Sequence, residues 1–242
     1  LGCGLVAFGK TLHRFAFNHG MMPYQIMGDA MWPKVKFNRR SRAITEAEHV
    51  RLVKYFSEAG ERVYRMALKH HPDTTIAQWQ EEWVNYLWFL WFTAASNSDA
   101  ASMKAENILW GERVIAYKRD KWQEPEETPP VCVAIAKGGQ LEKLLKALPA
   151  QGNLFPLLTQ IGQESRCRVF KKARERVGIK GRVTIHGYRF GFAERAKKGG
   201  MSVEDRMISL GHANYKMTHH YDKHALVTPQ SIEVLDGGLK VA

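Results

Sequence analysis

Residues 185–221 read IHGYRFGFAERAKKGGMSVEDRMISLGHANYKMTHHY, and this stretch says most about the fold. It contains the quartet His-Gly-Tyr-Arg, which ends at Arg189, and the triplet Leu-Gly-His, which ends at His212. His212 lies 23 residues after Arg189 (212 − 189), and Tyr221 lies 9 residues after His212 (221 − 212). Cationic side chains and a phenol therefore follow one another at defined intervals.

These residue types suit chemistry on a phosphodiester. Negative charge builds on its oxygens during attack, so a protein that works without a metal must supply fixed cations and hydrogen-bond donors. Arginine grips two phosphate oxygens and keeps its charge, and histidine can donate to the same oxygens or move a proton near neutral pH. A tyrosine can attack and hold the cut strand as a phosphotyrosine. His186, Arg189, His212 and Tyr221 are therefore the candidate catalytic residues.

The charge of the chain favours an anionic partner. Its 242 residues hold 36 Lys and Arg against 24 Asp and Glu, which gives a formal charge of +12 and a pI near 9.7. An excess of this size most often indicates nucleic-acid binding, with a merely basic protein as the alternative. Basic side chains also precede the first motif, where they indicate either DNA-backbone contact or a solvated helix face: Lys171, Lys172, Arg174, Arg176, Lys180 and Arg182.

Cysteine content and hydropathy exclude two protein classes. Cys3, Cys132 and Cys167 are too few and too far apart for a disulfide framework or a CxxC metal site, and they suit a reducing cytoplasm.

The apolar run at 83–93 is too short to span a bilayer and predicts a buried core helix. The histidines near Tyr221 fit no common zinc spacing, so we expect no metal site. The chain starts at Leu1 without a signal-peptide pattern, which we interpret as a fragment or a processed product.

Periodicity predicts a mainly α fold with a small antiparallel β-sheet, an α+β protein. Two alternating, β-branched runs at 113–118 and 131–135 predict strands, and the polar stretch between them is too long for a tight turn. Thr45 and Glu48 form a Thr-x-x-Glu capping box at the start of a helix. The predicted helices lie at 5–19, 46–56, 61–70, 75–95, 98–104, 139–148, 163–177, 187–198, 203–210 and 213–221.

In its three motifs the chain resembles the tyrosine recombinases, also called phage-type integrases. Their catalytic domain carries His-x-x-Arg, then Leu-Gly-His, then a tyrosine nine residues further on. The likeness extends upstream to 90–108, LWFTAASNSDAASMKAENI, where Thr93 matches the family's threonine and Asp99 its acidic residue. The resemblance implies the tyrosine-recombinase catalytic-domain fold over nearly the whole chain.

Two positions depart from the family pattern. Ser96 stands where the family has its first catalytic arginine, and Ala94 stands where it has a glycine. A serine donates one neutral hydrogen bond, and a charge-assisted bond is about twice as strong. Loss of one such donor typically costs about 10²–10³ in rate. The resemblance therefore implies a recombinase whose site is altered at Ser96.

The resemblance also implies further residues and boundaries. The family's general-acid lysine matches Lys121, with Lys118 as the alternative, and a solvated basic hairpin would explain both. Residues 1–38 match the C-terminal end of the core-binding, DNA-clamping domain with its linker, the front of that domain being absent. The catalytic domain matches 39–225, and the tail at 226–242 could be exchanged between protomers.

The function implied by the resemblance is site-specific recombination in a mobile element. Tyr221 would cut and rejoin duplex DNA through a 3′-phosphotyrosine intermediate, with Arg189, His186 and His212 holding the phosphate. The implied partners are double-stranded DNA and copies of the chain in a tetramer on paired sites, without membrane, metal or other cofactor. The implied location is the cytoplasm, in association with the nucleoid, for a prokaryotic or phage-derived protein. The alternatives are a catalytically inactive DNA-binding relative and a type IB topoisomerase-like DNA-relaxing enzyme.

Overall fold

The computed structural model describes residues 2–27, 31–32, 41–119, 130–212 and 214–222. The chain divides into two compact units, Leu1–Arg40 and Ser41–Ala242. In the first unit, α1 (Gly2–Asn18) is followed by Gly20, whose φ of +66° lies in the left-handed region that favours glycine. The helix predicted at 5–19 is therefore present and begins three residues earlier.

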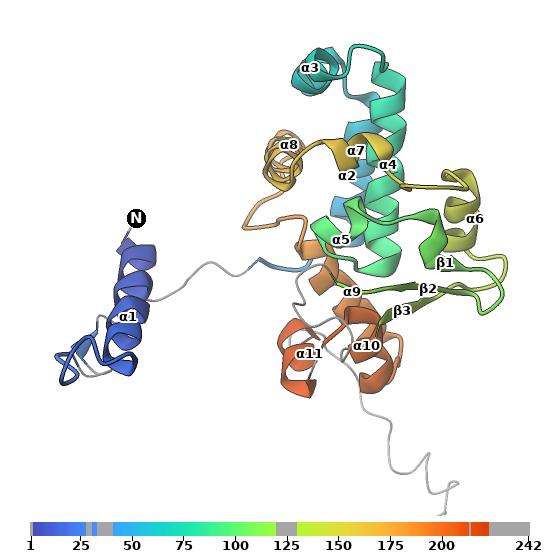
Figure 1. Ribbon diagram of the computed structural model, residues 1–242. Helices are drawn as coiled ribbons and strands as arrows, with labels where there is room; N and C mark the ends of the chain where they lie inside the picture. Colours follow the sequence, from blue (N-terminus) through green and yellow to red (C-terminus); the bar gives the residue numbers. More distant parts are fainter. Residues whose placement is uncertain (1, 28–30, 33–40, 120–129, 213, 223–242) are drawn as a thin grey trace, which may run out of the picture. The chain divides into compact units, whose positions relative to one another are not determined.

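The second unit is mainly helical and contains one small sheet (Figure 1). Its helices are α2 (Glu46–Glu58), α3 (Glu61–His70), α4 (Ile76–Thr93), α5 (Asn97–Ala101), the 3-10 turn η2 (Ala105–Asn107), α6 (Gln140–Ala147), α7 (Pro156–Gln160), α8 (Gln163–Arg176), α9 (Gly187–Lys198), α10 (Val203–Leu210) and α11 (Tyr215–Asp222). Its strands are β1 (Ile108–Leu109), β2 (Val114–Tyr117) and β3 (Val131–Ala134).

Side-chain caps explain where several of these helices begin. The Thr45 hydroxyl accepts from the Glu48 backbone while the Glu48 carboxylate accepts from the Thr45 backbone, so the predicted capping box is confirmed. A second box uses Thr75 at the start of α4. The Ser202 hydroxyl accepts from the Asp205 backbone at the start of α10. These caps satisfy amide groups that a helix leaves unpaired at its first turn.

The sheet is antiparallel with the order β1-β2-β3, and Ile115 of β2 pairs with Val133 of β3. The two predicted strands are present as β2 and β3. The sequence did not predict β1, because two residues are too few for an alternating pattern. It also did not predict α7, which has only five residues and starts at Pro156.

Helix α4 forms the centre of the core. Trp83, Tyr86, Leu87 and Phe89 are almost completely buried, and the Trp83 ring stacks on Phe56 of α2 at 4.6 Å between centroids. The prediction of a core helix at 83–93 is therefore confirmed. Within the described parts of the chain, no helix is long and apolar enough to cross a membrane. Figure 1 shows α9, α10 and α11 gathered beside one end of α4 and the sheet, which places the ends of these helices close together.

Candidate active site

The start of helix α9 positions the first two candidate residues, His186 and Arg189. His186 is the residue before the helix, and its side chain is exposed. Arg189 points inward and is only 1% exposed. Its Nη1 donates to the carbonyl of Ala94, at the end of α4, over 2.9 Å. Its Nη2 is buried and has no hydrogen-bond partner among the residues that the structure describes.

This buried cation makes the site suited to an anion. Burial lowers the pKa of Arg189, and the neighbouring charge of Arg119 lowers it further. An arginine still keeps its proton, because its ordinary pKa lies above 12. Burying a charge is costly unless a partner of opposite charge compensates it. A bound anion would therefore stabilise the Arg189 guanidinium.

The turn between α10 and α11 positions His212. Helix α10 ends at Leu210 and is capped by Gly211, whose φ of +54° is left-handed. His212 follows and is buried, with its Nδ1 3.0 Å from the Thr218 hydroxyl oxygen of α11. The His212 and Tyr221 rings lie 4.8 Å apart between centroids. The histidine is therefore held by the helix that carries the tyrosine.

Tyr221 lies among the other three candidates. Its hydroxyl oxygen is 2.8 Å from His186 Nε2. Its ring stacks on Phe190 at 4.4 Å, and the Arg189 guanidinium carbon is 5.7 Å from the ring centroid. The structure thus brings His186, Arg189 and His212 around one phenol, from positions up to 35 residues away in the sequence.

A buried ion-pair cluster holds α11 in place. Asp222, next to Tyr221, is 0% exposed. Its carboxylate lies 3.0 Å from Arg206 Nη2 of α10 and 3.5 Å from Lys197 Nζ of α9. His219 Nδ1 of the same helix lies 3.5 Å from it. These contacts connect the tyrosine-bearing helix to both neighbouring helices.

Ser96 has a structural task at the α4–α5 turn. Its hydroxyl accepts a hydrogen bond from the Asp99 backbone over 3.2 Å and so caps α5. Ala94, where the family has a glycine, adopts a φ of +55°, a conformation that favours glycine. The turn reaches the site through the Ala94 carbonyl, which accepts from Arg189. Ser96 therefore lies two residues from Ala94, which contacts Arg189, and its side chain is neutral.

The lysine predictions have different outcomes. Lys121 lies outside the described residues, so its role stays a prediction. Lys118 directly follows β2 and is exposed. Between them lies Arg119, which the sequence motifs do not indicate. Arg119 is 7% exposed, its Nε donates to Asp99 Oδ2 over 3.3 Å, and its Nη1 donates to the Gly211 carbonyl over 3.4 Å. Strand alternation could have found it, because Arg119 has the same parity as the buried residues Ile115 and Tyr117.

Comparisons with known proteins agree with this architecture. No family model matches the chain, and no curated protein matches it. Solved structures do. The Tn1549 transposon integrase in complex with transposon right-end DNA matches with a TM-score of 0.62 and 11% identity, over 98% of this chain and 78% of that one. The chain has the fold of the tyrosine recombinases.

Two further recombinase structures give the same result. The catalytic domain of bacteriophage HP1 integrase matches with a TM-score of 0.51 and 19% identity, over 77% of this chain and 89% of that domain. XerA recombinase matches with a TM-score of 0.51 and 18% identity, over 74% of this chain. The matched region spans 59% of the XerA chain. The predicted fold class, a mainly α tyrosine-recombinase domain with a small antiparallel sheet, is therefore confirmed.

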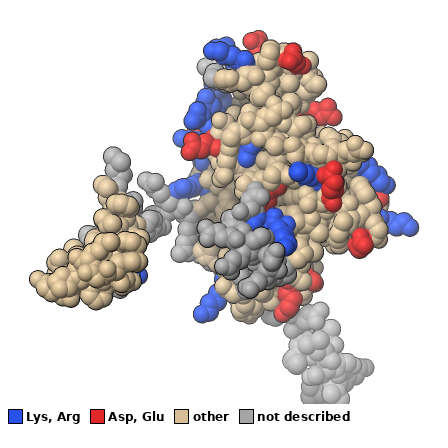
Figure 2. All heavy atoms as spheres, viewed as in Figure 1, with Lys and Arg blue, Asp and Glu red and all other residues tan. Residues whose placement is uncertain are grey.

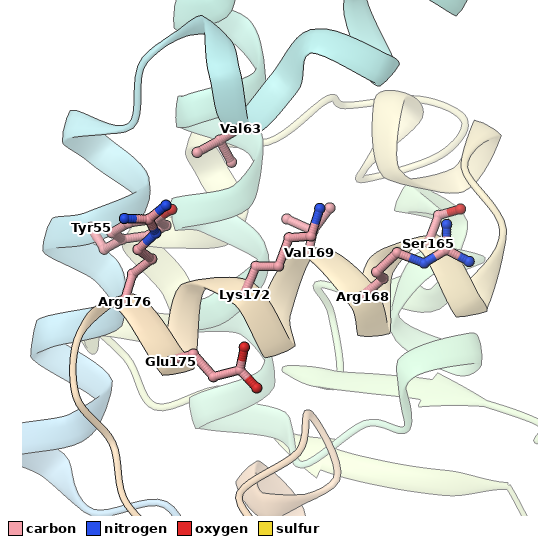
Figure 3. A pocket seen from close by; sticks show the side chains of 8 residues that line it. All are labelled: Tyr55, Val63, Ser165, Arg168, Val169, Lys172, Glu175 and Arg176. Carbon is pink, nitrogen blue, oxygen red and sulfur yellow. The ribbon is translucent and has the colours of Figure 1, made fainter.

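The recombinase fold leaves a basic edge away from the candidate site. Figure 2 shows Lys and Arg side chains gathered over α3 and α8. A cavity of about 760 Å³ lies between α2, α3 and α8, and Figure 3 shows Arg168, Lys172 and Arg176 of α8 around it. None of the candidate catalytic residues lines it. No group of three or more His, Cys, Asp or Glu that could hold a metal occurs in the described ranges.

Proposed function

We propose that the chain is a site-specific DNA recombinase that cuts and rejoins duplex DNA through Tyr221. The observation that carries this proposal is the 2.8 Å contact between the Tyr221 hydroxyl and His186 Nε2. Arg189 and His212 lie against the same tyrosine ring, so an acceptor for the phenol proton and two phosphate-binding groups surround one nucleophile. The fold shared with the recombinase structures supports the same reaction class.

In the proposed cleavage step, the Tyr221 oxygen bonds to the scissile phosphorus and the bond from phosphorus to the 5′ oxygen breaks. The phenol proton passes to His186 Nε2, which is within hydrogen-bond reach of it. Arg189 and His212 hold the charge that builds on the non-bridging oxygens. The leaving 5′ oxygen takes a proton from Lys121, the general acid implied by the resemblance. Rejoining runs these steps backwards with a 5′ hydroxyl as nucleophile.

The proposed substrate is double-stranded DNA. The formal charge of +12 supports a phosphate-dominated interface, and the Tn1549 integrase structure contains transposon-end DNA. Release of condensed counterions makes such an interface weaken steeply as salt rises. We infer a tetramer on paired DNA sites as the working assembly, on the strength of the resemblance alone.

The test traps the covalent intermediate. The protein is incubated with nicked duplexes of randomised sequence, in which the short fragment released by cleavage diffuses away and rejoining fails. We expect a DNA–protein adduct that resists denaturation and is absent from Tyr221→Phe. The matched control is Tyr215→Phe, an exposed tyrosine on the same helix, which should keep the adduct. An equal adduct yield in both variants would exclude Tyr221 as nucleophile.

A second candidate is a DNA-binding relative that no longer cuts DNA. Ser96 favours it, because a neutral helix cap stands where the family has an arginine. This candidate predicts salt-dependent DNA binding by the wild-type protein without any adduct. A type IB topoisomerase-like activity would instead relax supercoiled plasmids that lack a specific site. One series of binding, trapping and relaxation assays therefore separates the three.

A further inference from the structure

Two buried arginines lie near one carboxylate beside the candidate site. Arg189 is 1% exposed, Arg119 is 7% exposed and Asp99 is 4% exposed. Arg119 Nε lies 3.3 Å from Asp99 Oδ2. Arg189 is tied to the same region by its bond to Ala94, two residues before Ser96. The end of β2 and the start of α9 therefore deliver two guanidinium groups to the α4–α5 turn.

Hydrogen bonds fix Arg119 between the two turns that frame the site. On one side, Arg119 Nε donates to the Asp99 carboxylate. The backbone N–H of Asp99 in turn donates to Ser96 Oγ over 3.2 Å. On the other side, Arg119 Nη1 donates to the carbonyl of Gly211, the residue before His212. The guanidinium thus connects the turn that carries Ser96 with the turn that carries His212.

The two buried arginines act on each other electrostatically. Burial is the main cause that lowers the pKa of Arg189, and the positive charge of Arg119 is the second. The described residues place two guanidinium groups, those of Arg119 and Arg189, near the Asp99 carboxylate in a buried region, where a bound anion would stabilise the buried positive charge. The charges of both arginines and of Asp99 act on Tyr117, the last residue of β2. Its hydroxyl is buried without a hydrogen-bond partner within the described residues. A phosphodiester would supply negative charge and acceptor oxygens.

We propose that Arg119 is the second phosphate-binding cation of this site, supplied from the end of β2 in place of an arginine at Ser96. This assignment rests on the proposed strand-cutting function. It identifies Arg119 as the group that supplies the positive charge that Ser96 lacks. Strand parity directs Arg119 inward and leaves Lys118 exposed. The planar guanidinium can contact a carboxylate and a phosphate with different N–H groups, which a lysine point charge does less well.

The experiment compares two scissile phosphates in the DNA sequence recovered from the trapped adducts. One is the ordinary phosphodiester, and the other is a methylphosphonate, which lacks the negative charge. Arg119→Ala should slow cleavage of the phosphodiester by about 10²–10³, as expected for loss of one charged donor. On the methylphosphonate, the deficit should shrink by about tenfold or more, because no charge remains to be compensated. A purely structural role would give the same deficit on both substrates and would overturn the proposal.

The matched control is Arg113→Ala. Arg113 directly precedes β2 and is also ion-paired, with Arg113 Nη2 2.9 Å from Glu142 Oε2, but it contacts no candidate residue in the described structure. Its removal should leave cleavage within about twofold of wild type, the range of ordinary surface substitutions. A loss equal to that of Arg119→Ala would mean that disruption of the sheet, and not phosphate binding, causes the defect, which overturns the proposal.

A rescue variant separates this inference from the proposed function. In an Arg119→Ala background, Ser96→Arg should restore cleavage by about tenfold or more, because it returns a guanidinium to the same turn. If wild type forms no adduct and Ser96→Arg alone does, Arg119 is not the missing cation, although the recombinase chemistry is retained. If neither protein forms an adduct, the proposed function fails and this inference fails with it. Equal cleavage by wild type and Arg119→Ala overturns the inference alone.

Discussion

The helices α9, α10 and α11 differ from the α4–α5 turn in how they supply the site. The three helices and the turn before α11 bring His186, Arg189 and His212 around Tyr221. The α4–α5 turn brings Ser96, whose hydroxyl is used in capping α5. On the account proposed here, the missing charge enters from the neighbouring strand. A fold can therefore determine where a charge is needed without determining which residue supplies it.

The largest effect should come from the intact region, with Arg189→Lys. A lysine keeps the charge and loses the fork that bonds the Ala94 carbonyl and grips two phosphate oxygens. We expect the cleavage rate to fall by about 10²–10³. The measurement is single-turnover cleavage of the trapped sequence, with Arg176→Lys on the exposed end of α8 as control. An unchanged rate in Arg189→Lys would mean that charge alone, and not geometry, matters at this position.

An intermediate effect should follow from loosening α11 with Asp222→Asn. The substitution removes the charge that pairs with Arg206 and Lys197, and leaves these cations uncompensated. Removing one partner of a buried ion pair costs about 3–5 kcal/mol, and the partly exposed Lys197 places this case at the low end. Urea unfolding measures it, with exposed Asp205→Asn as control. A cost below that of the control would show that α11 is held by other contacts.

The smallest effect concerns the scaffold that both regions share. Burial, and secondarily the charge of Arg195, lowers the pKa of His49 to about 3. An unfolded histidine titrates near 6.5, so between these values the unfolded state binds the extra proton and the folded state loses stability as the pH falls. The loss is at most about 1.4 kcal/mol per pH unit.

His49→Gln should flatten this part of the profile of unfolding free energy against pH. Exposed His70→Gln serves as control and should leave the slope unchanged. The readout is the unfolding free energy at pH 7, 6, 5 and 4, compared with wild type. A slope that persists in His49→Gln would assign the acid sensitivity to other groups and remove His49 from the account of the scaffold.

The sequence predicted the framework well where elements are long and capped. Helical periodicity and the Thr45–Glu48 box defined α2 through α4, whereas β1 and α7 were too short to give a periodic signal. Motif spacing placed four candidate residues that the structure brings together. Strand alternation could have indicated that Arg119 points inward, but the sequence could not predict its pairing with Asp99, which joins residues 20 positions apart across a strand end and a helix. Such pairings depend on tertiary packing, which a local pattern does not contain.

Peptide mapping of the trapped adduct identifies the residue that attacks the DNA. The adduct is digested with protease and nuclease, and the peptide that keeps a nucleotide is sequenced by mass spectrometry. We expect one modified residue, Tyr221, linked to a 3′-phosphate, in wild type and in Tyr215→Phe. A nucleotide on Tyr215 or a histidine, or a 5′ linkage, would contradict it.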